Sequence, residues 1–224
     1  GERRTRGNFK AKRLEKIGGK SVSSALFSRE LKGYFAFYGY VMNTAAGALM
    51  ALIFTGLLVF GGEALFASAV DPSINVTVVL PLFVTMMCYC GVIAPPTASG
   101  ISIEGNRLWI LRSLPVSAAD IFKAKLKLQL LIMWPVCVIA GGAAAFALKA
   151  GALNAAIAIL LPMAYALFSG LVGLVTNLML PMLNWKNPMV PIKRGGSVLL
   201  CMVIGFVAIA VPVVIFLLCG PDFT

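Results

Sequence analysis

The sequence contains no histidine, and only 12% of its 224 residues are charged. The absence of histidine excludes Ser-His-Asp triads, histidine metal sites and histidine proton relays. Five cysteines are present, but their spacing matches neither a zinc site nor a disulfide framework, and most of them fall within apolar runs, where free thiols are commonly buried and inert. The chain therefore offers few of the groups from which catalytic sites are built.

Apolar residues, by contrast, make up 60% of the chain, and the mean hydropathy is +0.94. This composition excludes a soluble globular protein and indicates an integral membrane protein. Five apolar runs are each long enough for a spanning helix of about 20 residues. They cover residues 35–60, 74–94, 128–148, 155–180 and 197–218. We therefore expect an all-α integral membrane protein, a polytopic bundle of about five transmembrane helices formed by one domain, residues 24–224.

Lysine and arginine are distributed very unevenly between the connecting segments. Ten precede the first span, five lie between the second and third spans, three lie between the fourth and fifth, and only Lys149 falls elsewhere. Because cytosolic loops are enriched in these residues, the basic lead-in 1–23 and the loops 95–127 and 181–196 are predicted to be cytosolic. The net charge of +11 then reflects topology and contact with lipid headgroups in the cell membrane, and no nucleic-acid partner is expected.

Packing signals also occur in and beside the spans. Residues 24–37 place apolar and charged side chains on different sides, which predicts an amphipathic helix in the membrane interface. Gly47, Gly141 and Gly173 each lie near another small residue, a pattern that allows two helix backbones to approach closely. Asn177, near the inner end of the fourth span, is expected to form hydrogen bonds between helices.

The longest polar segment between apolar runs is the loop 99–127, which precedes the third span. Ser117 followed by Asp120 is a capping pattern, and it predicts that a helix begins at Ser117 and continues into that span. Pro115 separates this helix from a shorter one predicted over residues 106–114. Such a loop can transmit motion from a cytosolic partner to the spans. The alternative is a solvated loop that only reverses the chain.

Two motifs in the cytosolic loops resemble a known family. The first is Glu-Gly, then Leu-Pro-x-Ser and a basic helix, formed by Glu104, Gly105, Leu114, Pro115, Ser117 and Lys125; the second is formed by Asn184, Trp185, Pro191 and Lys193. Over residues 28–196 the chain resembles the membrane subunits of ABC type-2 transporters, in particular the permeases of bacterial ABC exporters. Their complete domain has six spans, so the resemblance implies that the chain is the C-terminal half of a longer protein, with a further span after Thr224.

The resemblance also implies partners and a mechanism. A separate cytosolic ABC ATPase subunit would bind ATP and Mg and receive a coupling helix in the loop 95–127, while a second permease half or subunit would complete the path through the bilayer. No cofactor or metal is expected in this chain, which would not be an enzyme. We expect packing contacts from Leu108, Trp109 and Leu111, polar contacts from Arg107 and Arg112, and a fixed loop geometry from Glu104, with Gly105, Leu114 and Pro115 completing the segment.

The sequence supports other functions less well. The segment Gly19-Lys20-Ser21 resembles the end of a phosphate-binding loop, but Leu14 stands where the first glycine should be. A membrane-embedded lipid enzyme would need more positioned acids and bases than Glu104 and Asp120 supply on the cytosolic side. The remaining alternative is a membrane scaffold or assembly factor that transports nothing.

Overall fold

The computed structural model describes residues 21–70 and 78–219, and all of the regular secondary structure in these ranges is helical. The elements are α1 (Val22–Ala36), α2 (Tyr38–Thr44), α3 (Ala46–Val70), α4 (Val79–Val92), the 3-10 turns η2 (Pro96–Ala98) and η3 (Ser102–Arg107), α5 (Leu108–Ser113), α6 (Ala118–Ala147), α7 (Ala152–Met179), α8 (Met189–Arg194) and α9 (Gly196–Cys219). Most of the predicted basic lead-in 1–23, the start of the predicted span 74–94 and Thr224 lie outside the described residues.

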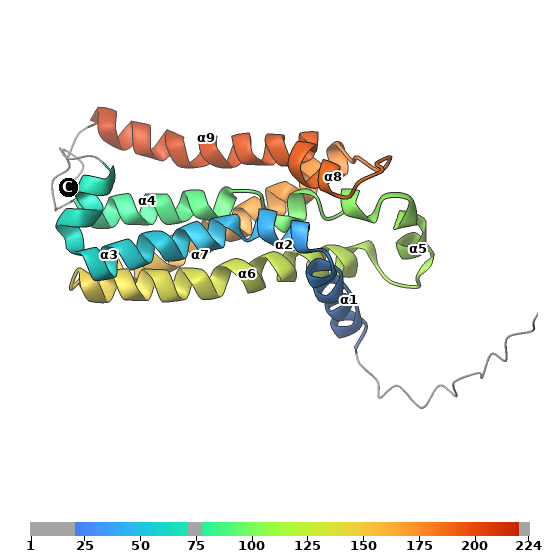
Figure 1. Ribbon diagram of the computed structural model, residues 1–224, viewed down its shortest axis with the longest axis horizontal. Helices are drawn as coiled ribbons and strands as arrows, with labels where there is room; N and C mark the ends of the chain where they lie inside the picture. Colours follow the sequence, from blue (N-terminus) through green and yellow to red (C-terminus); the bar gives the residue numbers. More distant parts are fainter. Residues whose placement is uncertain (1–20, 71–77, 220–224) are drawn as a thin grey trace, which may run out of the picture.

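The long helices lie side by side as one bundle, and the short elements gather at one end (Figure 1). We call this end, which carries α1, η2, η3, α5 and α8, the loop end. Among the described residues, four helical stretches are long and apolar enough to cross a membrane, and α2 with α3 makes a fifth if the bent pair counts as one span. The prediction of an all-α, polytopic membrane bundle is confirmed.

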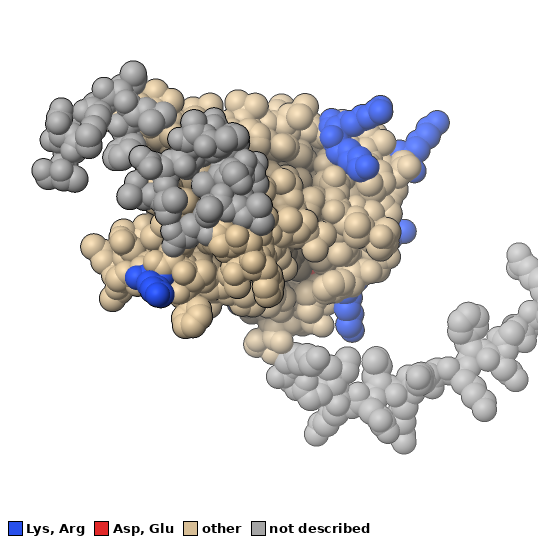
Figure 2. All heavy atoms as spheres, turned by 60° about the vertical axis from the view of Figure 1, so that its left-hand side comes forward, with Lys and Arg blue, Asp and Glu red and all other residues tan. Residues whose placement is uncertain are grey.

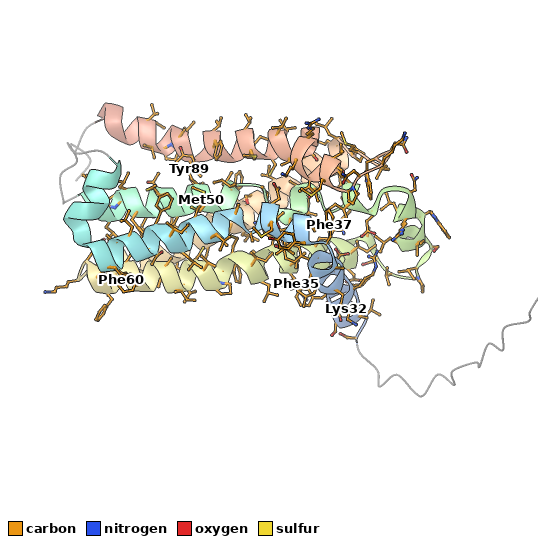
Figure 3. All side chains as sticks on the ribbon, in the orientation of Figure 1. Lys32, Phe35, Phe37, Met50, Phe60 and Tyr89 are labelled. Carbon is orange, nitrogen blue, oxygen red and sulfur yellow. The ribbon has the colours of Figure 1, made fainter. Side chains whose placement is uncertain are left out.

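The first predicted span, 35–60, is not one continuous helix as the sequence suggested. Phe37, labelled in Figure 3, has extended backbone angles (φ −119°, ψ 94°) and separates α1 from α2. A second break at Ala45 turns α2 by 47° relative to Ala46–Gly62. Just before it, the Thr44 hydroxyl donates a 2.8 Å hydrogen bond to the Tyr40 carbonyl, a bond to the preceding turn that bends helices.

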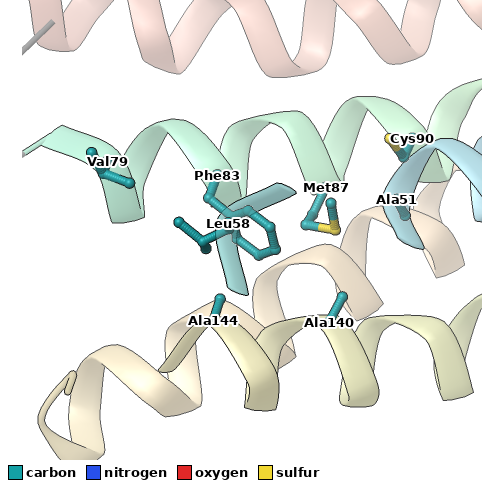
Figure 4. Close-up of a cluster of buried hydrophobic side chains, with 8 residues drawn as sticks. All are labelled: Ala51, Leu58, Val79, Phe83, Met87, Cys90, Ala140 and Ala144. Carbon is teal, nitrogen blue, oxygen red and sulfur yellow. The ribbon is translucent and has the colours of Figure 1, made fainter. Parts of the chain in front are cut away.

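Helix α4 lies inside the bundle and is enclosed by α3, α7 and α9. Its Phe83 and Met87 are fully buried and meet Leu58 of α3, with Ala140 and Ala144 of α6 across from them (Figure 4). The alanines leave room for the large side chains, so three helices share one well-filled layer. Contact with three neighbouring helices explains why α4 is apolar along nearly its whole length.

Gly47 and Gly141 allow the predicted close contacts between helices, whereas Gly173 lies against the 3-10 turn η2. A Cβ atom at Gly47 would clash with the carbonyl of Cys90, and one at Gly141 would lie 2.5 Å from the carbonyl of Ala158. Because lipid tails are as apolar as leucine, this backbone approach supplies much of the attraction between spans through van der Waals contact. The predicted close contacts of Gly47 and Gly141 are therefore confirmed.

The connection between α7 and α9 differs from the prediction. Residues 181–188 are not helical, but Met189–Arg194, within the predicted loop 181–196, form α8. Pro191 is the third residue of that helix, where a backbone N–H has no partner within the helix, so its missing donor costs nothing. Proline spacing alone could not separate this first-turn position from an extended one.

Gly141 and Gly142 provide a matched test of this packing. Gly141→Ala should lower the free energy of unfolding by about 1–3 kcal/mol, because the new methyl group meets the backbone of Ala158. Gly142→Ala should raise it by about 0.5–1 kcal/mol, because no atom lies within 4 Å of that position and alanine favours the helix. Unfolding in mixed micelles measures both. Equal effects of the two substitutions would contradict the close packing of α6 on α7.

Candidate functional site

Helix α5 forms the outermost part of the loop end in Figure 1. Three of its neighbouring apolar side chains face outward: Trp109 is 67% exposed, Ile110 44% and Leu114 40%. Leu111, by contrast, is only 3% exposed and packs inside the chain. A tryptophan so exposed on a six-residue helix is suited to contact with another protein or with lipid headgroups.

The helical boundaries of this segment follow the sequence. Leu114 is extended (φ −73°, ψ 143°) before Pro115, as predicted, and α6 begins at Ala118 with Ser117 as its N-cap. The Ser117 hydroxyl oxygen accepts from the Asp120 backbone N–H at 3.1 Å, and the hydroxyl donates to the Asp120 carboxylate at 2.7 Å. The 30 residues of α6 then run without interruption into the bundle, so α5 is joined to a span by a short, stiff connection.

Four charged side chains form a closed cluster beneath α5, which we call the charge ring. Lys125 of α6 lies between two carboxylates, 2.9 Å from Glu30 of α1 and 3.2 Å from Glu104 of η3. Arg29 of α1 closes the ring at 2.7 Å from Glu104 and 3.2 Å from Glu30. The ring therefore ties α1, the loop and α6 to one another.

The side chain of Lys125 is only 4% exposed, so its charge is held almost entirely by protein groups. Its third hydrogen bond goes to the carbonyl oxygen of Gly100 at 2.9 Å. An ammonium group has three N–H donors, and Lys125 uses all three. A buried charge that is fully paired in this way stabilises one arrangement, whereas removal of a partner leaves a costly unpaired charge.

A second buried centre lies at the start of the same loop. Asn177 of α7 is completely buried; its Oδ1 accepts from the backbone N–H groups of Ile101 (2.8 Å) and Ser102 (3.0 Å). Its Nδ2 donates to the hydroxyls of Ser102 (2.8 Å) and Ser197 (2.9 Å). The amide thus uses its full hydrogen-bonding capacity and joins α7, the loop and α9. The predicted role of Asn177 in bonding helices together is confirmed.

The two predicted cytosolic loops meet at Trp185. Its indole N–H donates a 2.7 Å hydrogen bond to the carbonyl oxygen of Ser102, and its ring covers Gly105. Gly105 has φ +51°, and a Cβ atom there would lie 3.0 Å from the ring, so glycine suits both the backbone and the contact. Of the predicted site residues, the structure thus brings Glu104, Gly105 and Trp185 together.

The other predicted residues differ in exposure. Arg107 and Pro115 are exposed and Leu108 is half-buried beside Trp109. In the second loop, Asn184 and Lys193 are exposed while Pro191 is buried. The side chain of Arg112 lies outside the described part of the chain.

Tyrosine hydroxyls connect the loop to α1 and α2. The Tyr40 hydroxyl donates to the Pro96 carbonyl oxygen at 2.7 Å, and the hydroxyls of Tyr34 and Thr44 share a 2.9 Å hydrogen bond. Burial raises the pKa of Tyr34, partly offset by its bond to Thr44, so the phenol stays neutral. Polar contacts of this kind between distant segments give no periodic signal in the sequence.

Charge is concentrated at the loop end. Figure 2 shows lysine and arginine side chains gathered on that side of the molecule, with a separate blue patch toward the opposite end. Among the described residues, no group of three or more His, Cys, Asp or Glu side chains is placed to hold a metal ion.

Comparisons of the chain with known families, curated proteins and solved structures return no match. The function therefore has to be inferred from the residues and their geometry.

Lys125→Met should lower the free energy of unfolding by about 3 kcal/mol, because Glu30 and Glu104 are left facing each other with only Arg29 between them. Lys123→Met, which changes an exposed lysine on the same helix, is the control and should alter stability by less than about 0.5 kcal/mol. Addition of Glu104→Gln to Lys125→Met should recover part of the loss, since a single carboxylate, Glu30, then remains beside Arg29. If Lys125→Met is no worse than Lys123→Met, the ring does not hold the loop end together.

Proposed function

We propose that the chain is the membrane-spanning permease subunit of an ATP-binding-cassette exporter, driven by a separate cytosolic ATPase subunit. The loop end is then cytosolic, and α5 is the coupling helix that enters a groove on the ATPase. The observation that carries the proposal is the exposed apolar surface of α5, formed by Trp109, Ile110 and Leu114. It lies at the end of the bundle where the lysine and arginine side chains gather.

The charge ring supports this proposal because it connects α5 to the membrane-embedded helices. A displacement of α5 moves η3, and Glu104 of η3 is bonded to both α1 and α6. The same displacement moves Ser102, whose carbonyl oxygen is hydrogen-bonded to Trp185 in the segment that precedes α8 and α9. ATP-driven closure of a partner could thus be transmitted to several spans at once.

The energy source also fits the composition of the spans. Carriers driven by ion gradients commonly place acidic or basic residues within the membrane. Lys125 is the one charged side chain that is buried in the described part of the chain, and it lies at the loop end with all its hydrogen bonds made. A separate ATPase is therefore the energy source that we propose, and a second permease subunit would complete the translocation path.

The test is a double substitution on α5. Trp109→Ala with Ile110→Ala should weaken co-purification of the ATPase by about 30-fold or more, because a central tryptophan in an interface contributes about 2 kcal/mol. The measurement is a pull-down of the full parent protein from detergent, with mass spectrometry and an ATPase assay on the captured proteins.

Phe146→Ala is the matched control. Phe146 is also an exposed aromatic residue, but it lies near the C-terminal end of α6, the end away from α5. It should leave the captured ATPase unchanged. Capture of no ATPase, or capture that survives loss of both α5 side chains, would contradict the proposal and favour a scaffold that transports nothing.

A further inference from the structure

A cavity of about 740 Å³ lies at the end of the bundle opposite the loop end. One wall is the first turns of α4, with Leu80 and Val84, and the other is α7, with Ile157 and Leu161. The turn between α6 and α7 closes its end. A ligand pocket in a protein commonly has this size and mostly apolar walls.

Polar groups line the same cavity on one side. They are Lys149 and Asn154, from the turn and the first turn of α7, and Thr85 of α4. The Thr85 hydroxyl already donates to the carbonyl oxygen of Pro81 at 2.9 Å, so the lysine and the asparagine are the groups available to a ligand. Both side chains are exposed where the turn between α6 and α7 meets the surface, which we call the mouth of the cavity. The α7 wall is open as well, with Ile157 44% and Leu161 42% exposed.

Lys149 differs from every other lysine and arginine in the described part of the chain, because all the others lie at the loop end. All ion pairs among the described residues are likewise at the loop end. The positive charge of Lys149 thus lies beside an apolar cavity, at the end of the bundle opposite the other lysine and arginine residues.

The backbone holds Lys149 in a fixed and costly conformation. Its φ is +48°, a value that favours glycine, and the neighbouring Ala150 N–H donates to the Ala145 carbonyl oxygen at 2.9 Å to close the end of α6. Glycine would fit this position with less strain, yet a long cationic side chain occupies it. The cation is thus presented by a tight turn at the cavity mouth.

We propose that this cavity binds an anionic lipid from the adjacent membrane leaflet. The acyl chain lies between α4 and α7, and the phosphate meets Lys149 and the Asn154 amide at the mouth. An uncharged or zwitterionic headgroup gains less from a single lysine, so the site distinguishes lipids by headgroup charge. The site does not depend on the proposed ATPase partner.

The charge requirement is tested by native mass spectrometry of the full chain, titrated with phosphatidylglycerol or with phosphatidylcholine of identical acyl chains. The parent should retain phosphatidylglycerol preferentially, and Lys149→Gly should reduce that preference by about fivefold, the effect of one lysine near a lipid headgroup. Because glycine suits φ +48°, the variant should fold at least as well. Lys149→Arg should keep the preference, and so should Lys186→Gly, which removes an exposed lysine at the loop end.

The cavity walls are tested by Ile157→Trp, which fills the space between the helices, with Leu153→Trp as the control one turn earlier on α7 and not among the lining residues. Only Ile157→Trp should reduce the retained phosphatidylglycerol. Glycerol phosphate, which has the headgroup without acyl chains, should not compete with the lipid.

Three outcomes would overturn the proposal: an unchanged preference in Lys149→Gly, an equal loss in Lys186→Gly, or full displacement by glycerol phosphate. Each can occur whether or not an ATPase partner exists, so failure of this site is distinguishable from failure of the permease function.

Discussion

A charged lysine can remain buried in an apolar bundle only if protein groups replace the hydrogen bonds that water would make to its ammonium group. Two carboxylates and a carbonyl oxygen do this for Lys125. The requirement fixes more than one side chain. Glu30 has to come from α1 and Glu104 from the loop, so both segments must lie against α6 before the charge is paired. The need to pair the charge of Lys125 therefore holds α1, the loop and α6 together at the loop end.

The rest of the bundle is held by a different force. Between the spans, Gly47 and Gly141 bring backbones into direct contact, and α4 fills the centre with large side chains against alanines. These contacts gain little from the exclusion of water, since lipid surrounds the bundle, and they depend on close fit. One end thus carries a specific polar network, with Asn177 as its second centre, and the remainder is a packed apolar body.

Patterns that repeat along the chain predicted most of this architecture. Length and apolarity located the spans, and the cap at Ser117 gave the start of α6. The bend at Ala45 and helix α8 were missed, because a threonine bonding to its own turn and a proline in a first helical turn look like ordinary span and loop residues. The charge ring was missed because the salt bridges that join its three segments connect residues 21 to 95 positions apart, a separation at which single-sequence patterns carry no information.

Through the charge ring, α1, the loop and α6 form one body at the loop end. Hydrogen exchange of the intact chain in lipid nanodiscs tests it directly, by comparing the backbone amides of α1 with those of residues 99–107 when Lys125 is replaced by methionine. If one body exists, exchange rises in both segments together, while the amides of α7 near Ala158 keep their protection. A rise in residues 99–107 with α1 unchanged would show that α1 is held by its apolar contacts alone and that the charge ring does not join it to the loop.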